Sequence, residues 1–104
     1  MENVTPEHIT NLGSQGKKIV VDYWSETCRP CITLTPILEK LEKEFTDITF
    51  EKINAKQHLD HLFSIGINSV PTVVLYSGDN LSEKITGLRS EDFYRTTFSD
   101  FNAK

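Results

Sequence analysis

The chain has 104 residues, of which 38% are hydrophobic and 25% are charged, and its formal net charge is −4. This length accommodates one hydrophobic core, so we expect residues 1–104 to form a single domain. The acidic balance excludes a broad nucleic-acid surface, because phosphate contacts need clustered Lys and Arg. No apolar run approaches the ~20 residues of a membrane span, and the first residues lack the basic and apolar regions of a signal peptide. We therefore expect a cytoplasmic protein with no membrane or nucleic-acid partner.

The first half of the chain predicts a strand, a helix and a second strand. β-Branched and aromatic residues over 18–24 indicate a strand that is buried on both faces. Apolar residues then recur at helical spacing from Leu34 to Phe45, which predicts an amphipathic helix. Residues 49–53 are typical of a second strand. A strand–helix–strand unit places its two strands in parallel through a right-handed crossover.

The second half predicts a short helix, a hairpin and a last helix. Residues 58–65 indicate the short helix, and residues 70–76 the first strand of the hairpin. A short polar turn joins this strand to an antiparallel one over 81–86. Ser90 is the expected N-cap of the last helix, whose expected apolar face consists of Phe93, Thr97, Phe98 and Phe101. The order of elements predicts an α/β fold in which helices flank both faces of a mixed central β-sheet.

The two cysteines, Cys28 and Cys31, lie between the first predicted strand and the first predicted helix. A disulfide framework would place its cysteines far apart to close long loops, and this pair closes almost none. A cysteine at a helix N-cap points its sulfur at unpaired backbone N–H groups and at the positive end of the dipole, which favours the thiolate. Pro30 is tolerated in the first helical turn. The spacing brings Cys31 back over Cys28, so one thiol can attack a mixed disulfide made by the other.

Other interpretations of these residues stay open at this point. The cysteines could form half of a zinc site with His58 and His61, but zinc-finger histidines are usually more widely spaced, which favours ordinary polar positions on a helix. An acid such as Asp22 is expensive to bury in an apolar strand, which favours a functional role over a place at a strand edge or a cap. Lys52 either faces solvent or belongs to the same site.

Several motifs occur together in one order from Lys17 to the C-terminus. They are Val21-Asp-Tyr-Trp24, Cys28-Arg-Pro-Cys31, the helix proline Pro36, Lys52, Val70-Pro71-Thr72 and Gly87. In this order and at these intervals the chain resembles the thioredoxin family over nearly its whole length. The resemblance implies the thioredoxin fold and chemistry at the two cysteines.

The resemblance implies a role for each residue of the reactive centre. Cys28 would be the attacking nucleophile and Cys31 the buried resolving thiol, and the two would form a redox-active disulfide. Asp22 would lie behind Cys31 and act as its general base, since burial raises the pKa of a carboxyl toward neutrality. Lys52 would lie nearby and modulate that pKa.

The resemblance also implies a substrate-binding surface around the cysteines. Pro71 would be a cis-proline opposite the pair, and a cis X-Pro bond is rare enough to be a deliberate feature of shape. The backbone at Val70 would pair with the substrate chain, and Trp24 would pack against the active-site turn. The residues expected at this surface are Trp24, Arg29, Pro30, Val70, Pro71 and Gly87.

The chain departs from the family pattern at four places, one of which is Ile32, where a basic residue is common just after Cys31. Arg29 replaces the usual Gly, and a cation beside Cys28 is expected to stabilise its thiolate and make the couple more oxidising. Thr27 stands where a second Trp is usual, which removes an aromatic substrate contact. The segment before Lys17 is short, so we expect the first strand to be vestigial or missing and, if present, to lie within residues 1–5.

The function predicted from these observations is that of a protein-disulfide reductase, a thiol–disulfide oxidoreductase that maintains cytosolic redox homeostasis. We expect no bound cofactor and no metal, with electrons supplied from NADPH through a separate thioredoxin reductase. The expected partners are disulfide-containing proteins and that reductase, and the expected state is a monomer. The alternatives are a disulfide oxidant or isomerase, to which Arg29 points but against which the absent signal peptide argues, and a thioredoxin-fold binding subunit without turnover.

Overall fold

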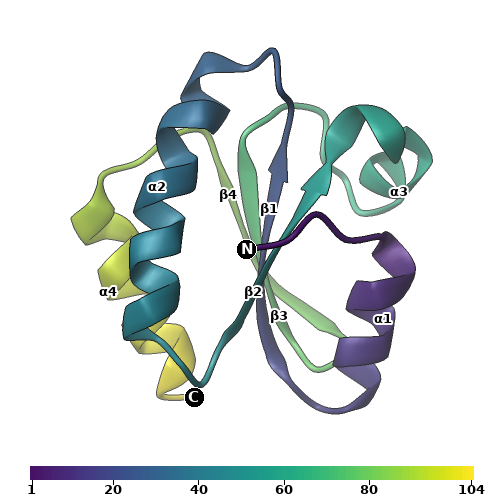
Figure 1. Ribbon diagram of the computed structural model, residues 1–104. Helices are drawn as coiled ribbons and strands as arrows, with labels where there is room; N and C mark the ends of the chain where they lie inside the picture. The colour runs from purple at the N-terminus through teal and green to yellow at the C-terminus, as the bar shows by residue number, and fades with distance from the viewer.

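The computed structural model describes residues 1–104 as a four-stranded sheet between two pairs of helices (Figure 1). In chain order the elements are α1 (Pro6–Ser14), β1 (Lys18–Trp24), α2 (Arg29–Glu44), β2 (Thr49–Asn54), a short 3-10 helix (Ala55–Gln57), α3 (Leu59–Ser64), β3 (Thr72–Ser77), β4 (Asn80–Thr86) and α4 (Glu91–Asn102). The strand order is β2-β1-β3-β4, with β1 and β2 parallel and the other two pairs antiparallel. The predicted mixed sheet of an α/β fold is confirmed. None of the helices has the length and apolar character that a membrane crossing requires.

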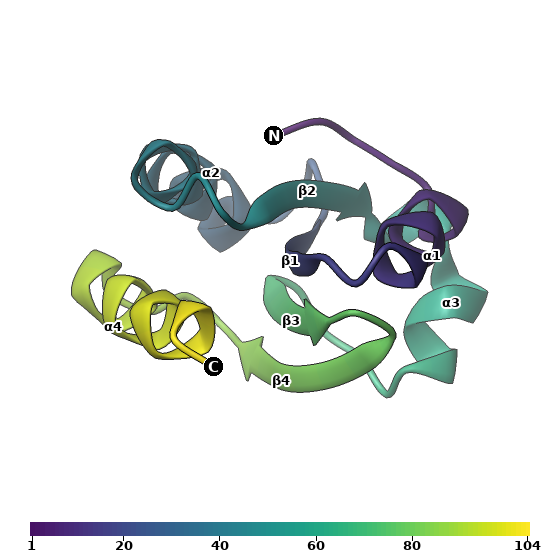
Figure 2. The same cartoon turned by 90° about the horizontal axis from the view of Figure 1, so that it is seen from below.

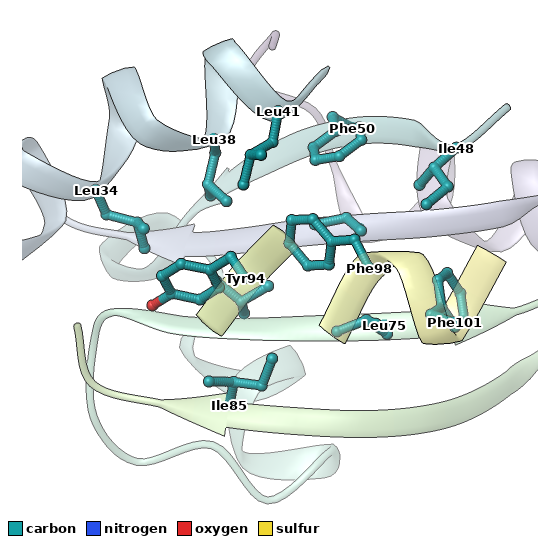
Figure 3. Packing of buried hydrophobic residues seen from close by; sticks show 12 residues of the cluster. Leu34, Leu38, Leu41, Ile48, Phe50, Leu75, Ile85, Tyr94, Phe98 and Phe101 are labelled. Atoms are coloured by element: carbon teal, nitrogen blue, oxygen red, sulfur yellow. The ribbon is translucent and has the colours of Figure 1, made fainter. Parts of the chain in front are cut away.

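Helices α2 and α4 cover one face of the sheet, which Figure 2 shows end-on. Their apolar residues meet those of the strands in one buried cluster (Figure 3), whose members are Val20, Leu34, Leu38, Leu41, Ile48, Phe50, Val73, Leu75, Ile85, Tyr94, Phe98 and Phe101. Phe98 lies at its centre, with its ring edge-to-face against Phe50 at 5.5 Å between centroids. Each large side chain buried here stabilises the fold by about 1.5–3 kcal/mol.

Helices α1 and α3 cover the opposite face (Figure 2) and bury a smaller cluster that includes Ile9 and Leu62. This face contains polar atoms as well. The hydroxyl of the fully buried Tyr23 lies 3.0 Å from the hydroxyl of Tyr76 and 2.8 Å from Nε2 of His61. The hydroxyl is therefore satisfied, as a buried polar group needs to be.

The N-terminal segment differs from the expectation, because it forms helix α1. Thr5 caps this helix by accepting a hydrogen bond from the backbone N of His8, and Pro6 occupies its first turn. The family's first strand is reduced to a bridge between Asn3 and Lys52, flanked by the bond from the N–H of Val4 to the carbonyl of Lys52 at 2.9 Å. The expectation of a vestigial first strand within residues 1–5 is confirmed.

The last helix buries a different face from the predicted one. Tyr94 is buried with Phe98 and Phe101, whereas Phe93 is 38% exposed and Thr97 is half-buried. Tyr94 is accommodated because its hydroxyl donates to the carbonyl of Gly87 at 3.2 Å and accepts from a backbone N–H at 3.0 Å. The predicted apolar face was therefore wrong at Phe93, and it omitted Tyr94.

Candidate active site

The two cysteines lie at the turn between β1 and α2, as predicted. Cys28 is the N-cap of α2, with extended backbone angles, and its Sγ accepts the N–H of Cys31 at 3.3 Å. Pro30 falls in the first helical turn, where its missing N–H leaves no bond unmade. Cys28 and Cys31 form a disulfide with their Cα atoms 5.3 Å apart. The first turn of α2 therefore holds a redox-active pair against the positive end of the helix dipole.

The two sulfurs differ in exposure. Cys31 is 0% exposed because it lies on the face of α2 that packs on the sheet, whereas Cys28 is half-buried at the surface. The exposed Arg29 and Pro30 separate them on the outer side of the turn. A disulfide of another protein can therefore reach Cys28 and cannot reach Cys31 directly.

The segment opposite Cys28 is the start of β3. The Val70–Pro71 peptide bond is cis, as the resemblance implied, and the carbonyl oxygen of Val70 lies 3.7 Å from Sγ of Cys28. Strand β3 begins at Thr72 and not at residue 70, since a proline has no N–H for the ladder. The N–H of Gly87 donates to the carbonyl of Pro71 at 2.8 Å. Gly87 itself has φ of +84°, a backbone conformation that favours glycine.

Asp22 lies in the middle of β1 with no exposed surface, and neither carboxyl oxygen has a hydrogen-bond partner. Side chains alternate along a strand, so Asp22 shares with Val20 the face that α2 and α4 cover, which is also the face on which Cys31 is buried. Burial raises the pKa of Asp22 from its usual 3.8 to about 7, against the opposing charge of Lys52. A carboxyl with this pKa can accept and release a proton near neutral pH.

Lys52 lies beside Asp22 on the neighbouring strand β2, and Trp24 lies two residues beyond Asp22 on β1. Lys52 pairs with Asp22 in the register of β1 and β2, and its Nζ lies 4.7 Å from the ring centroid of Trp24. Trp24 is half-buried, and its Nε1 donates to Oδ1 of Asn3 at 2.8 Å. The indole thus links the N-terminal segment to the end of β1 and covers the ammonium group of Lys52.

A groove of about 360 Å³ opens beside Cys28. It is lined by Ser25, Thr27, Cys28, Ala55, Lys56, Leu59, Leu62, Phe63, Ile67, Asn68, Ser69 and Val70. Of the six residues predicted to contact substrate, only Val70 lines this groove; the other five, which lie outside it, are Trp24, Arg29, Pro30, Pro71 and Gly87. Leu59 and Phe63 were not expected at this site from the sequence. A signal was present, because Leu59 and Phe63 are four residues apart and so form a second apolar face on the helix that buries Leu62.

The histidines do not join the cysteines in a metal site. Nε2 of His61 lies 2.8 Å from the Tyr23 hydroxyl, and His58 begins α3 as its N-cap residue. Nowhere do three or more His, Cys, Asp or Glu side chains gather in a way that could hold a metal ion. The zinc interpretation of the sequence is not supported by this arrangement.

Comparisons with known proteins agree with this geometry. The family model for thioredoxin matches residues 2–99. Thioredoxin from Chlamydia pneumoniae is 35% identical over 75 residues, which cover 72% of this chain and 74% of that protein.

Two solved structures extend the likeness to the whole fold. A mutant thioredoxin from Halobacterium salinarum has a TM-score of 0.86 at 25% identity and covers 96% of this chain and 88% of its own. Oxidised mitochondrial thioredoxin 3 from Saccharomyces cerevisiae has a TM-score of 0.85 at 26% identity and covers 96% of this chain and 93% of its own. The chain therefore belongs to the thioredoxin family, and its Cys28–Cys31 pair makes it a thiol–disulfide oxidoreductase of the disulfide-reductase type.

Proposed function

We propose that the chain reduces disulfides of cytoplasmic proteins as a monomer and so maintains the redox balance of that compartment. The observation that supports this most is the asymmetry of the pair, since Cys28 faces a groove at the surface while Cys31 is buried beneath it. An attacking thiol has to reach the substrate, and a resolving thiol has to reach only its neighbour. Cys28 is therefore the nucleophile and Cys31 the resolving residue.

The reaction runs in two exchanges. In the reduced protein the Cys28 thiolate attacks one sulfur of the substrate disulfide, forms a mixed disulfide and expels the other sulfur as a thiolate. Cys31 then loses its proton and attacks Sγ of Cys28, which releases the second substrate thiolate and closes the Cys28–Cys31 disulfide. The substrate gains two electrons, the cysteine pair loses two, and both expelled thiolates take up protons.

Asp22 accepts the proton of Cys31 in the second exchange. Its carboxyl is buried on the same side of the sheet as Cys31, and a pKa of about 7 leaves much of it ionised at neutral pH. The ammonium group of Lys52 opposes the effect of burial and keeps this pKa from rising further. Lys52 is thus a positioning residue that acts through Asp22.

The substrate chain binds around the exposed sulfur. The carbonyl of Val70, 3.7 Å from Sγ of Cys28, accepts a backbone N–H of the substrate segment. The exposed Arg29 and Pro30 flank the sulfur on the helix side, and Pro71, held by Gly87, flanks it on the strand side. Trp24 ends β1 and so lies where the active-site turn begins.

Family membership implies disulfide-containing protein substrates and a reductase as partners, and the family needs no bound cofactor. We propose further that the pair is returned to the dithiol by electrons from NADPH, delivered by a separate thioredoxin reductase. The exposed cation of Arg29 beside Cys28 supports a second direction, in which the disulfide form oxidises or isomerises other proteins.

Turnover of a protein disulfide such as that of insulin, with dithiothreitol as the electron source, tests the proposal. The parent protein is expected to accelerate reduction, and Cys28→Ser and Cys31→Ser are expected to abolish turnover. Replacing dithiothreitol by NADPH and a thioredoxin reductase tests the recycling route separately. A parent protein that does not accelerate insulin reduction with either electron source would contradict the proposed function.

A further inference from the structure

The groove beside Cys28 continues along helix α3, away from the reacting sulfur. Figure 1 shows α3 at the same end of the sheet as the turn between β1 and α2. Cys28 and Val70 line the groove together with Leu59, Leu62 and Phe63 of α3. A substrate segment that brings its disulfide to Cys28 therefore has an apolar surface directly beside it.

Two residues of α3 expose apolar surface at this groove. Phe63 is 72% exposed, the largest value among the large hydrophobic residues, and Leu59 is 55% exposed. The two lie four residues apart on one helix, so they form one ridge. Leu62, which is buried, fixes the helix to the sheet beneath them. The ridge contributes little to folding and is available to a partner.

Thr27, which lines the groove next to Cys28 in the chain, is small and polar. Thr27 presents a hydroxyl that accepts a hydrogen bond from Nζ of Lys56 at 2.9 Å. A threonine leaves the groove open where a larger side chain would fill it, and the bond to Lys56 holds Thr27 in place. Of the large apolar residues that line the groove, Leu59 and Phe63 are the exposed ones, so apolar recognition falls mainly to their ridge.

We propose that Leu59 and Phe63 determine substrate specificity by binding a large apolar side chain of the substrate, two residues from its reacting cysteine. This inference rests on the proposed function, because the occupant is the polypeptide segment next to the disulfide under attack. In an extended segment, residues two apart point to the same face and lie about 6–7 Å apart. A side chain at that position projects along the groove from Cys28 toward α3.

Matched disulfide peptides test this assignment. There are two series of peptides: in one the variable residue lies two positions before the cysteine, and in the other it lies two positions after it. Within each series, one peptide carries Leu at the variable position and the other carries Ser. The parent protein is expected to reduce the Leu peptide of one series with a kcat/KM about tenfold above that of the Ser peptide, mostly through KM. Phe63→Ala is expected to bring this ratio below about twofold.

Phe93→Ala is the matched control, since it removes the same side chain from an exposed site on α4, which covers the other face of the sheet (Figure 2). This variant is expected to keep the preference for the Leu peptide. Equal kcat/KM for the Leu and Ser peptides in the parent, or a preference that survives Phe63→Ala, would overturn the inference. So would an equal loss in Phe93→Ala.

Two further measurements distinguish a failure of this inference from a failure of the proposed function and from self-association. Bis(2-hydroxyethyl) disulfide, which has no side chain to reach α3, is expected to be reduced equally by the parent and both variants. Failure of the parent on this small disulfide contradicts the proposed function, whereas success without peptide preference contradicts only the inference. Sedimentation is expected to show a monomer; a dimer abolished by Phe63→Ala would mean that a second copy covers the ridge and would also overturn the inference.

Discussion

The two faces of the sheet differ in the length of the helices that cover them and in the polar groups that they contain. The face under α2 and α4 is built from helices of 16 and 12 residues and contains Asp22 and Cys31 in a fully buried, apolar layer. The face under α1 and α3 is built from helices of 9 and 6 residues and contains the Tyr23–His61 contact. On the α2–α4 face burial raises the pKa of Asp22, to which we assign the proton transfer from Cys31. On the other face α3 leaves Leu59 and Phe63 exposed, and to these we assign recognition.

The largest expected effect is a difference in stability between the two faces. Phe98→Ala removes a fully buried ring that contacts Phe50 and Tyr94, and we expect it to lower the free energy of unfolding by about 3–5 kcal/mol. Leu62→Ala on α3 is expected to lower it by about 2 kcal/mol, because a short helix can shift to fill the space. Urea unfolding measures both values.

Amide hydrogen exchange sharpens the same comparison. Leu62→Ala is expected to speed exchange in α3 while leaving α2 protected, since a six-residue helix can open by itself. An equal loss of stability in both variants, with exchange raised over the whole chain, would show that the two faces unfold as one unit.

The next effect concerns the buried acid. The native protein keeps the Asp22 proton up to about pH 7, whereas the unfolded chain loses it near its usual pKa of 3.8. Below pH 3.8 both states hold this proton, and the native state has its full stability. As the pH rises from there the unfolded chain gives up the proton first, so the free energy of unfolding falls, and the loss is complete above about pH 7. Since each tenfold displacement of a protonation equilibrium is worth about 1.4 kcal/mol, the loss amounts to about 4 kcal/mol.

Asp22→Ala tests this effect in the oxidised protein. The variant is expected to be more stable than the parent by about 2–4 kcal/mol at about pH 8 and to lose most of that advantage at about pH 4. Its reduction of insulin at neutral pH is expected to be slower, because Cys31 has lost its proton acceptor. A gain in stability that does not change with pH would mean that Asp22 titrates normally.

A smaller effect is expected from the polar contact on the other face. Tyr23→Phe leaves His61 and Tyr76 each without one hydrogen-bond partner, which is expected to lower the free energy of unfolding by about 1–2 kcal/mol. Turnover of bis(2-hydroxyethyl) disulfide should stay unchanged, since this contact lies away from the cysteines. A drop in that turnover would link the α1–α3 face to the chemistry.

The smallest effect concerns Arg29. Removing its charge with Arg29→Gln or Arg29→Gly is expected to destabilise the Cys28 thiolate and make the couple more reducing. The expected change in the equilibrium constant with glutathione is about two- to fivefold. Arg29→Gln separates the charge from the backbone freedom that Gly adds. An unchanged or more oxidising couple in both variants would contradict a role for this cation.

Where the sequence pattern was strong, it predicted the elements well. The apolar run of β1, the periodicity of α2 and the cysteines between them all lie where they were expected. Helix α1 was missed, although Thr5 and Pro6 are a start signal, because only Ile9 and Gly13 of this helix are buried and its apolar pattern is weak.

Other features depend on contacts that a linear pattern does not contain. Tyr94 is buried in place of Phe93 because the loop at Gly87 supplies a partner for its hydroxyl. The position of Phe63 beside Cys28 follows from the packing of α3 on the sheet, which joins residues distant in sequence. The roles proposed for the residues of the reactive centre come from the resemblance, whereas spacing alone supported only the two cysteines.

Trapping of the mixed disulfide tests the central claim most directly, that an exposed Cys28 attacks and a buried Cys31 resolves. Reduced Cys31→Ser is incubated with a disulfide-bearing protein, and the covalent product is identified by mass spectrometry. We expect a stable adduct through Cys28 in this variant and none in Cys28→Ser. An adduct that forms through Cys31 in Cys28→Ser, with none in Cys31→Ser, would contradict the claim and reverse the two roles.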